Sequence, residues 1–162
     1  MRTLWTAVLA LTVAYPVPAQ LREVRPARTA FAFGWSDVTG YGTAVAFVER
    51  LQPVPLALGI AVGGGGAGAH LQVHLPNPFT PTPTDHEAVT YLSAGITRLF
   101  GRNEPGEAKV EWAAIFGTEL WPDRGAGFFT DFGGGVVGTI GGTTPGRHYG
   151  GVTLRFLMGW AF

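Results

Sequence analysis

The sequence predicts an all-β protein, an antiparallel up-and-down transmembrane β-barrel of eight strands. Three observations support this fold class. Bulky apolar residues alternate with small residues along most of the chain, no stretch carries a helical period, and charged residues make up only 14% of the 162 residues, against about a quarter in ordinary domains. A chain of this length has room for one domain. We divide it into a signal peptide (1–19), an N-terminal arm (20–28) and the barrel domain (29–162).

The beginning of the chain indicates export. It carries one cation, Arg2, then an apolar run over Leu4–Tyr15 and a small residue, Ala19, that suits a cleavage site. The apolar run is shorter than the ~20 residues that a membrane-spanning helix needs, although a retained anchor helix stays open as an alternative. The chain contains no Cys, so we expect neither a lipoprotein-type signal nor disulfides.

The first three predicted strands obey one rule, with large apolar residues on one face and mostly Gly or Ala on the other. They lie within 29–37 (TAFAFGWSD), 41–51 (YGTAVAFVERL) and 55–63 (PLALGIAVG). The residues of their large faces are Phe31, Phe33 and Trp35, then Tyr41, Thr43, Val45 and Phe47, then Leu56, Leu58, Ile60 and Val62.

The next two strands flank a proline-rich segment. The run Gly63–Gly66 predicts a turn, and the fourth strand follows at 69–75. This strand alternates apolar residues with His70, Gln72 and His74. Four prolines within Pro76–His86 exclude a helix and a central strand, so we expect a stiff exposed loop there. The fifth strand, about 87–100, has mixed faces, and a loop stays open as the alternative for it.

The last three strands return to regular alternation. The sixth covers 108–120 (AKVEWAAIFGTEL), a turn at 121–125 leads to the seventh near 127–140, and the eighth ends the chain within 150–162 (GGVTLRFLMGWAF). One face of the eighth strand is wholly bulky and apolar and consists of Val152, Leu154, Phe156, Met158, Trp160 and Phe162.

The size of the side chains on each strand face predicts whether the outside of the barrel meets water or lipid. A sandwich or a ligand-binding soluble barrel packs its bulky face inside and needs a polar exterior. Here the opposite faces of the first three strands are Gly and Ala, so we expect the bulky faces to meet lipid and the small faces to line a narrow barrel. A secreted soluble barrel that binds an apolar ligand is an alternative, which requires bulky faces that point inward. Aromatic residues near strand ends predict interfacial girdles: Trp35, Tyr41, Phe100, Trp121, Phe128, Tyr149, Trp160 and Phe162.

The export signal, the even strand number and the last strand resemble small eight-stranded outer-membrane β-barrel proteins of Gram-negative bacteria. In that family the last strand carries a signal for the barrel assembly machinery: a polar residue, a Gly and two aromatic residues ending on a terminal Phe. Arg155, Trp160 and Phe162 match this pattern, whereas Leu157 stands at the Gly position and Gly159 follows two residues later. The resemblance implies location in the outer membrane, contact with its lipid and with the assembly machinery, and a monomer.

The polar residues that fall on inward faces form an expected lumen network of His70, Gln72, His74, Lys109, Glu111, Glu119, Asp131 and Arg155. His70 and His74 are four residues apart on one strand, which separates them by ~13 Å, too far to share one ion. We therefore expect no metal and no cofactor. Charges in a narrow lumen are expected to pair and plug it, because unpaired buried charge is costly; a small gated pore is the alternative.

Nothing in the sequence predicts a catalytic residue. Some outer-membrane barrels are lipid A deacylases that use a His and a Ser two residues later, but here His148 is followed at that place by Gly150, and the only serines are Ser36 and Ser93. The 11 basic and 11 acidic residues cancel and are scattered, which argues against nucleic-acid binding. We expect a structural or envelope-associated protein without catalysis, with a membrane-embedded lipid-modifying enzyme as the alternative.

Overall fold

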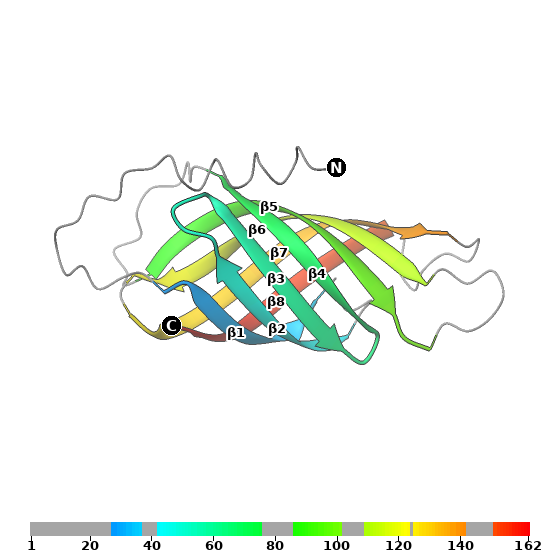
Figure 1. The fold of residues 1–162 in the computed structure, drawn as a ribbon, viewed down its shortest axis with the longest axis horizontal. Coiled ribbons are helices and arrows are strands. Elements are labelled where there is room, and N and C mark those ends of the chain that lie inside the picture. The colour runs from blue at the N-terminus through cyan, green and yellow to red at the C-terminus, as the bar shows by residue number, and fades with distance from the viewer. Residues whose placement is uncertain (1–26, 37–41, 76–85, 102–108, 124, 142–150) are drawn as a thin grey trace, which may run out of the picture.

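The protein folds as one closed antiparallel barrel. The computed structural model describes residues 27–36, 42–75, 86–101, 109–123, 125–141 and 151–162. Each strand pairs with its neighbours in sequence, and β1 pairs with β8 to close the sheet (Figure 1). The strands are β1 (Thr29–Trp35), β2 (Thr43–Arg50), β3 (Leu56–Gly63), β4 (Gly66–Leu75), β5 (His86–Leu99), β6 (Val110–Pro122), β7 (Gly127–Ile140) and β8 (Val152–Ala161). The all-β, eight-stranded, up-and-down fold predicted from the sequence is confirmed.

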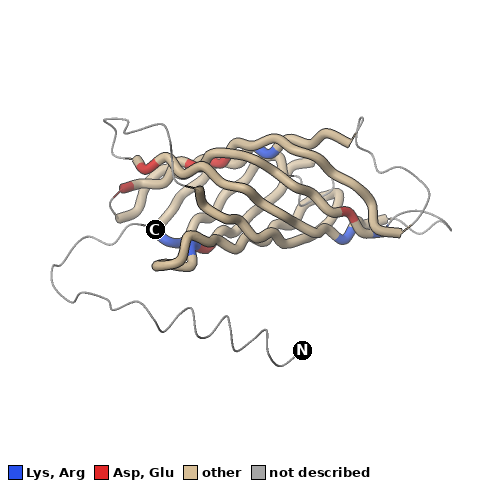
Figure 2. The backbone as a smooth tube through the Cα atoms, turned by 90° about the horizontal axis from the view of Figure 1, so that it is seen from above, with Lys and Arg blue, Asp and Glu red and all other residues tan. Residues whose placement is uncertain are grey.

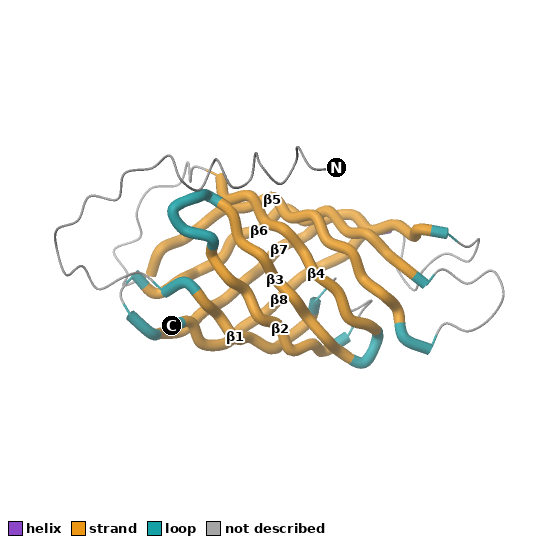
Figure 3. Tube along the Cα trace, viewed as in Figure 1, coloured by secondary structure: helices purple, strands orange, loops and turns teal. Residues whose placement is uncertain are grey.

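The strands agree with the sequence prediction in number but not in every bound or length. β4 begins at Gly66, because Gly63 and Gly66 pair directly and leave a turn of only two residues. β5 is one continuous strand of 14 residues, so the loop alternative for this segment is wrong. β1, β2 and β3 have 7 to 8 residues and are shorter than the 9–11 expected of a spanning strand, whereas β5, β6 and β7 have 13 to 14. Figure 3 shows that nearly all of the described chain is strand.

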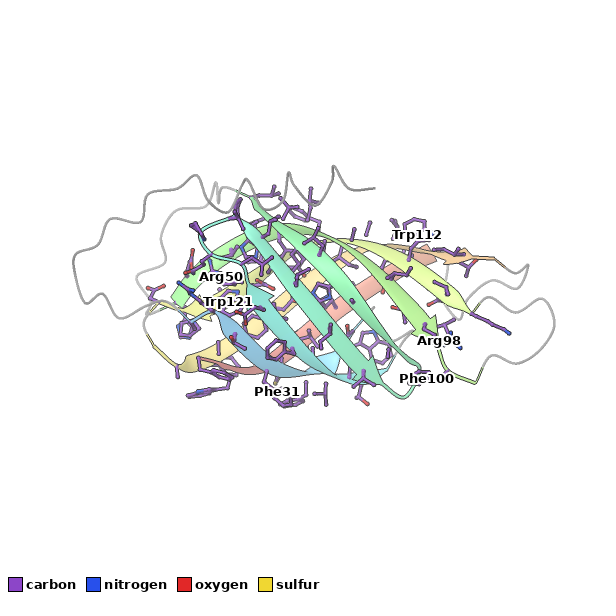
Figure 4. The ribbon with its side chains drawn as sticks, viewed as in Figure 1. Phe31, Arg50, Arg98, Phe100, Trp112 and Trp121 are labelled. Carbon is purple, nitrogen blue, oxygen red and sulfur yellow. The ribbon has the colours of Figure 1, made fainter. Side chains whose placement is uncertain are left out.

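The bulky apolar faces point away from the barrel interior. All eight strands carry exposed large apolar residues, such as Phe31 on β1 (Figure 4), Phe132 on β7 and Phe156 on β8. The intervening residues of β1 to β3 are alanines and glycines together with Val48 and, at the end of β2, Arg50. Because side chains alternate strictly along a strand, this one assignment fixes both surfaces. A soluble barrel that binds an apolar ligand would require the bulky faces to point inward, and here they point outward.

The outer surface carries almost no charge between its two ends. On the described strands, the outward acidic and basic residues of the alternation are Glu49 and Arg98, each second from the end of its strand. Glu49 accepts a hydrogen bond from Thr29 Oγ1 at 2.5 Å. Figure 2 shows the charged residues sparse along the wall and gathered toward the ends. The exterior is therefore an apolar band with a charge at each border.

The seam between β1 and β8 is closed at two glycines. Gly34 has a φ of 149°, a conformation that L side chains rarely adopt, and it pairs with Leu157. Gly159 pairs with Ala32, and a Cβ at Gly159 would come within 2.6 Å of the Ala32 Cα and overlap the carbonyl oxygen of Phe31. Both strands thus approach each other where no side chain lies between the backbones.

The two ends of the barrel are distinguished by their connections. The start of β1 and the end of β8 lie at one end, together with the connections from β2 to β3, β4 to β5 and β6 to β7. Ala27 and Arg28, predicted as part of the arm, are already held there: the Arg28 N–H donates to the Phe162 carbonyl at 3.2 Å. The predicted proline-rich loop lies outside the described residues except for His86, which begins β5. Within the described chain, no helix is long and apolar enough to cross a membrane.

Candidate functional site

The interior of the barrel is divided into a small-residue side and a polar side. The inward positions of β1 to β3 are nearly all Ala or Gly, whereas β4 to β8 contribute larger and polar side chains. We define the interior polar cluster as the buried residues Gln72, Tyr91, Ser93, Glu119, Asp131 and Arg155. These residues come from the five consecutive strands β4 to β8, and their side chains meet inside the barrel.

Glu119 is bound through both of its carboxylate oxygens. Gln72 Nε2 donates to Oε1 at 2.9 Å, and the Trp121 Nε1–H donates to Oε2 at 2.8 Å. His74 Nε2 lies 3.6 Å from the same Oε2. Glu119 is completely buried, and a buried carboxylate is tolerated only when donors replace the water that it has lost.

Asp131 stands beside Glu119 on the neighbouring strand and is held from the other side. The two carboxylates are direct cross-strand partners, an arrangement of like charges that is unfavourable by itself. Tyr91 Oη donates to Asp131 Oδ1 at 2.5 Å, and Arg155 Nη1 lies 3.6 Å from Oδ2. The Arg155 guanidinium also lies 5.8 Å from the centre of the Tyr91 ring. Arg155 is thus the cation that faces the two buried carboxylates of the cluster.

Two glycines make room for the cluster. Across the sheet, Tyr91 pairs with Gly117, Gly117 pairs with Gly133, and Gly133 pairs with Arg155. A Cβ at Gly117 would lie 2.5 Å from Tyr91 Oη, and one at Gly133 would lie 2.8 Å from the same atom. The tyrosine therefore lies across both glycines, and at these two positions β6 and β7 contribute no side chain to the interior.

His70 is positioned by the same device. It pairs with Gly59 on β3 and Gly95 on β5, and its imidazole occupies the space that a Gly59 side chain would need. Neither ring nitrogen has a hydrogen-bond partner among the described residues. His70 thus fills the interior by packing, and it does not join the hydrogen bonds of the cluster.

The end of the barrel near the termini is filled by an aromatic and ionic contact. Arg50 and Trp121 lie together at this end (Figure 4). The Arg50 guanidinium is 5.1 Å from the centre of the Trp121 ring, and its Nη1 is 2.8 Å from Glu87 Oε2. Beneath it, Trp121 contacts Phe129 edge to face, with ring centres 4.7 Å apart. These four side chains cover the interior polar cluster from this end.

The structure places most of the predicted lumen residues inside the barrel and corrects two assignments. The residues found inside are His70, Gln72, His74, Glu111, Glu119, Asp131 and Arg155. Lys109 is exposed and precedes β6, so its assignment to the lumen is wrong: the alternation does not begin until Val110. Trp121 was expected in an interfacial girdle but is completely buried inside, because β6 extends to Pro122 and keeps its alternation through Glu119 and Trp121.

Sequence reasoning missed Tyr91, Ser93, Arg50 and Glu87. The mixed faces of β5 concealed Tyr91, since Thr90 beside it is also buried although it alternates outward. A usable signal was present in the neighbouring strands, where Gly117 and Gly133 each follow or precede a buried acidic residue on the inward face, Glu119 on β6 and Asp131 on β7. Only the register shows that both glycines lie in the same row as Tyr91.

The interior offers little to a substrate. Ser93 is buried, and its Oγ lies 3.4 Å from Arg155 Nη2 as a hydrogen-bond partner. Ser36 is buried as well, and the segment around His148 lies outside the described residues. No group of three or more His, Asp or Glu side chains in the described chain is placed to hold a metal ion. Of the residues that match the assembly signal, Trp160 and Phe162 are exposed on the outer face, whereas Arg155 is inside.

Comparisons of the chain with protein-family models, with curated proteins and with solved structures find no match.

Proposed function

We propose that this chain is an outer-membrane β-barrel protein that spans the bilayer and has a structural or envelope-associated role without catalysis. The observation that supports it is the inverted polarity of the closed sheet. Bulky apolar side chains cover the outside of all eight strands, while the buried carboxylates and Arg155 lie inside. A closed barrel satisfies every strand hydrogen bond within the sheet, which hydrocarbon requires and water does not.

The filled interior supports a structural role over a pore. Tyr91, Trp121, Phe129 and Arg155 are completely buried. Tyr91 donates a hydrogen bond to Asp131, and Trp121 donates one to Glu119. An eight-stranded barrel has an interior only just wide enough for side chains, so these residues occupy its cross-section. The burial of both serines supports the absence of serine-based hydrolysis.

Cell fractionation and gel migration test the membrane proposal. We expect the protein in the outer-membrane fraction, soluble only in detergent, and migrating faster in detergent gels when unheated than when boiled, because a closed barrel resists unfolding by detergent. Its removal from the membrane by detergent but not by high salt would distinguish spanning from surface binding. Recovery as a soluble periplasmic protein would contradict the proposal.

Conductance in planar bilayers tests the plug. We expect no stepwise current from the natural protein, since its interior is filled. The double variant Tyr91→Ala with Arg155→Ala removes the two side chains that lie over the glycine row and should admit small ions. The matched control is Phe132→Ala with Leu154→Ala, which removes outward side chains only. Channels of regular size in the natural protein would favour the gated-pore alternative.

A further inference from the structure

A groove interrupts the bulky outer surface on β4 to β7. It has a volume of about 460 Å³, and its floor is formed by the small residues Ala94 and Ala114, which are cross-strand partners, and by Gly134. Leu92, Phe116 and Val136 form its sides. The large side chains around these small residues make the groove a recess in an apolar wall. Its lining suits an alkyl chain.

A cation stands beyond one end of this groove. The outward face of β5 runs from Ala94 through Ile96 to Arg98, which places the Arg98 Cα about 13 Å from the Ala94 Cα at ~3.3 Å per residue. Arg98 is exposed, and no described residue forms an ion pair with it. Lys109 is also exposed and lies at the same end of the barrel, where the Leu99 N–H donates to the Lys109 carbonyl at 2.9 Å.

Exposed aromatic residues mark the same level of the barrel. Figure 4 shows Arg98, Phe100 and Trp112 toward the end opposite Arg50. Trp112 lies against Gly138 on the outer face, where a Cβ would come within 2.6 Å of its Nε1, so the indole is packed against the wall. Trp and Tyr or Phe beside an Arg are typical of the boundary between hydrocarbon and headgroups. The groove thus points from hydrocarbon depth toward a positively charged border.

We propose that the groove and Arg98 form a binding site for one anionic phospholipid, with an acyl chain in the groove and the phosphate on the Arg98 guanidinium. The proposal rests on the membrane-spanning function proposed above. A guanidinium binds phosphate through two parallel N–H donors, and Lys109 adds positive charge at the same end of the barrel. Charge complementarity favours a lipid over a second copy of this chain, because an apolar contact between two copies would bring two Arg98 side chains to its border.

Native mass spectrometry of the detergent-solubilised full chain tests this site with two defined probes, phosphatidylglycerol and phosphatidylcholine of identical acyl chains. We expect one phosphatidylglycerol to be retained in preference to phosphatidylcholine. Arg98→Gln should weaken phosphatidylglycerol retention about tenfold, the loss expected for a charge-assisted hydrogen bond. Arg28→Gln, which removes an exposed arginine at the opposite end of the barrel, should leave retention unchanged.

A second pair of variants tests the groove itself. Ala114→Phe fills the recess and should abolish retention of both lipids, whereas Ala69→Phe enlarges an exposed outward alanine outside the groove and should not. Faster gel migration of the unheated sample verifies that each variant is folded. Equal retention of the two lipids, no effect of Arg98→Gln, or a dimer that Ala114→Phe dissociates would each overturn the lipid site. A chain that folds and stays soluble without detergent would instead overturn the membrane-spanning function.

Discussion

Replacing Arg155 by Met should lower the free energy of unfolding by about 3–5 kcal/mol, the loss expected when one partner of a buried charge group is removed. Glu119 and Asp131 are cross-strand neighbours and completely buried, and Arg155 Nη1 lies 3.6 Å from Asp131 Oδ2. Without the guanidinium, two adjacent carboxylates would remain inside the barrel. Urea unfolding in lipid vesicles, followed by tryptophan fluorescence, measures the change.

A second substitution separates charge from packing at this site. Adding Asp131→Asn to Arg155→Met leaves Glu119 as the single acid of the cluster, bound by Gln72 and Trp121 as before. The double variant should therefore recover part of the lost stability, because the two sites are in contact and their effects are not additive. Arg28→Met, at an exposed position, serves as the control and should change stability by less than about 0.5 kcal/mol. Equal losses in the single and double variants would contradict the electrostatic explanation.

The interior polar cluster fits inside the barrel because small and large inward side chains lie on different strands. β1 to β3 line the barrel almost wholly with alanine and glycine, so the long side chains of β4 to β8 can extend across the interior without meeting equally large ones. His70 against Gly59 is the clearest example, because the imidazole lies where a side chain on β3 would be. The small inward residues of β1 to β3 thus leave interior space for the longer side chains of β4 to β8.

Sequence alone could predict the fold and the two faces of each strand because both depend on local periodicity. Alternation needs no knowledge of partners, and large residues opposite Ala or Gly set the outward face of β1 to β3 before any pairing is known. The sequence prediction failed at strand ends, where the alternation begins or stops. Lys109 was counted as part of a strand that begins one residue later, and Trp121 was taken for a turn residue although the strand continues to Pro122.

The contacts of the interior polar cluster could not be predicted because they depend on register. Tyr91 and Arg155 lie 64 positions apart in sequence, and only the pairings through Gly117 and Gly133 place them in one row. A shift of one residue in any of these three pairings would move a polar side chain to the outer surface. The bond to Glu119 from Gln72 depends in the same way on the pairing of β4, β5 and β6, whereas the bond from Trp121 joins two residues of β6 itself.

The last strand differs from the outer-membrane assembly pattern that it resembles at Leu157, and the structure gives a physical reason for this difference. The family pattern has Gly where this chain has Leu157, which is completely buried with Trp121 and Phe129 in the apolar part of the interior. The position that cannot accept a side chain is Gly159, where the β1 backbone approaches. Closure of the barrel, and not filling of its interior, therefore explains why glycine is needed two residues later.

Gly159→Val should prevent or strongly impair closure of the barrel, with a loss of about 3 kcal/mol, the upper range for overpacking. Its Cβ would overlap the carbonyl oxygen of Phe31 and lie 2.6 Å from the Ala32 Cα, and neither backbone atom can move aside without breaking the pairing of β1 with β8. The fraction of unheated protein that migrates as the compact form measures closure. Gly134→Ala is the control, because its Cβ would make only ordinary contacts, with the Leu154 Cδ2 at 3.4 Å and the Thr153 carbonyl oxygen at 3.8 Å. If Gly159→Val closed as completely as Gly134→Ala, the seam would tolerate a side chain and the close approach of β1 and β8 would not be what requires glycine.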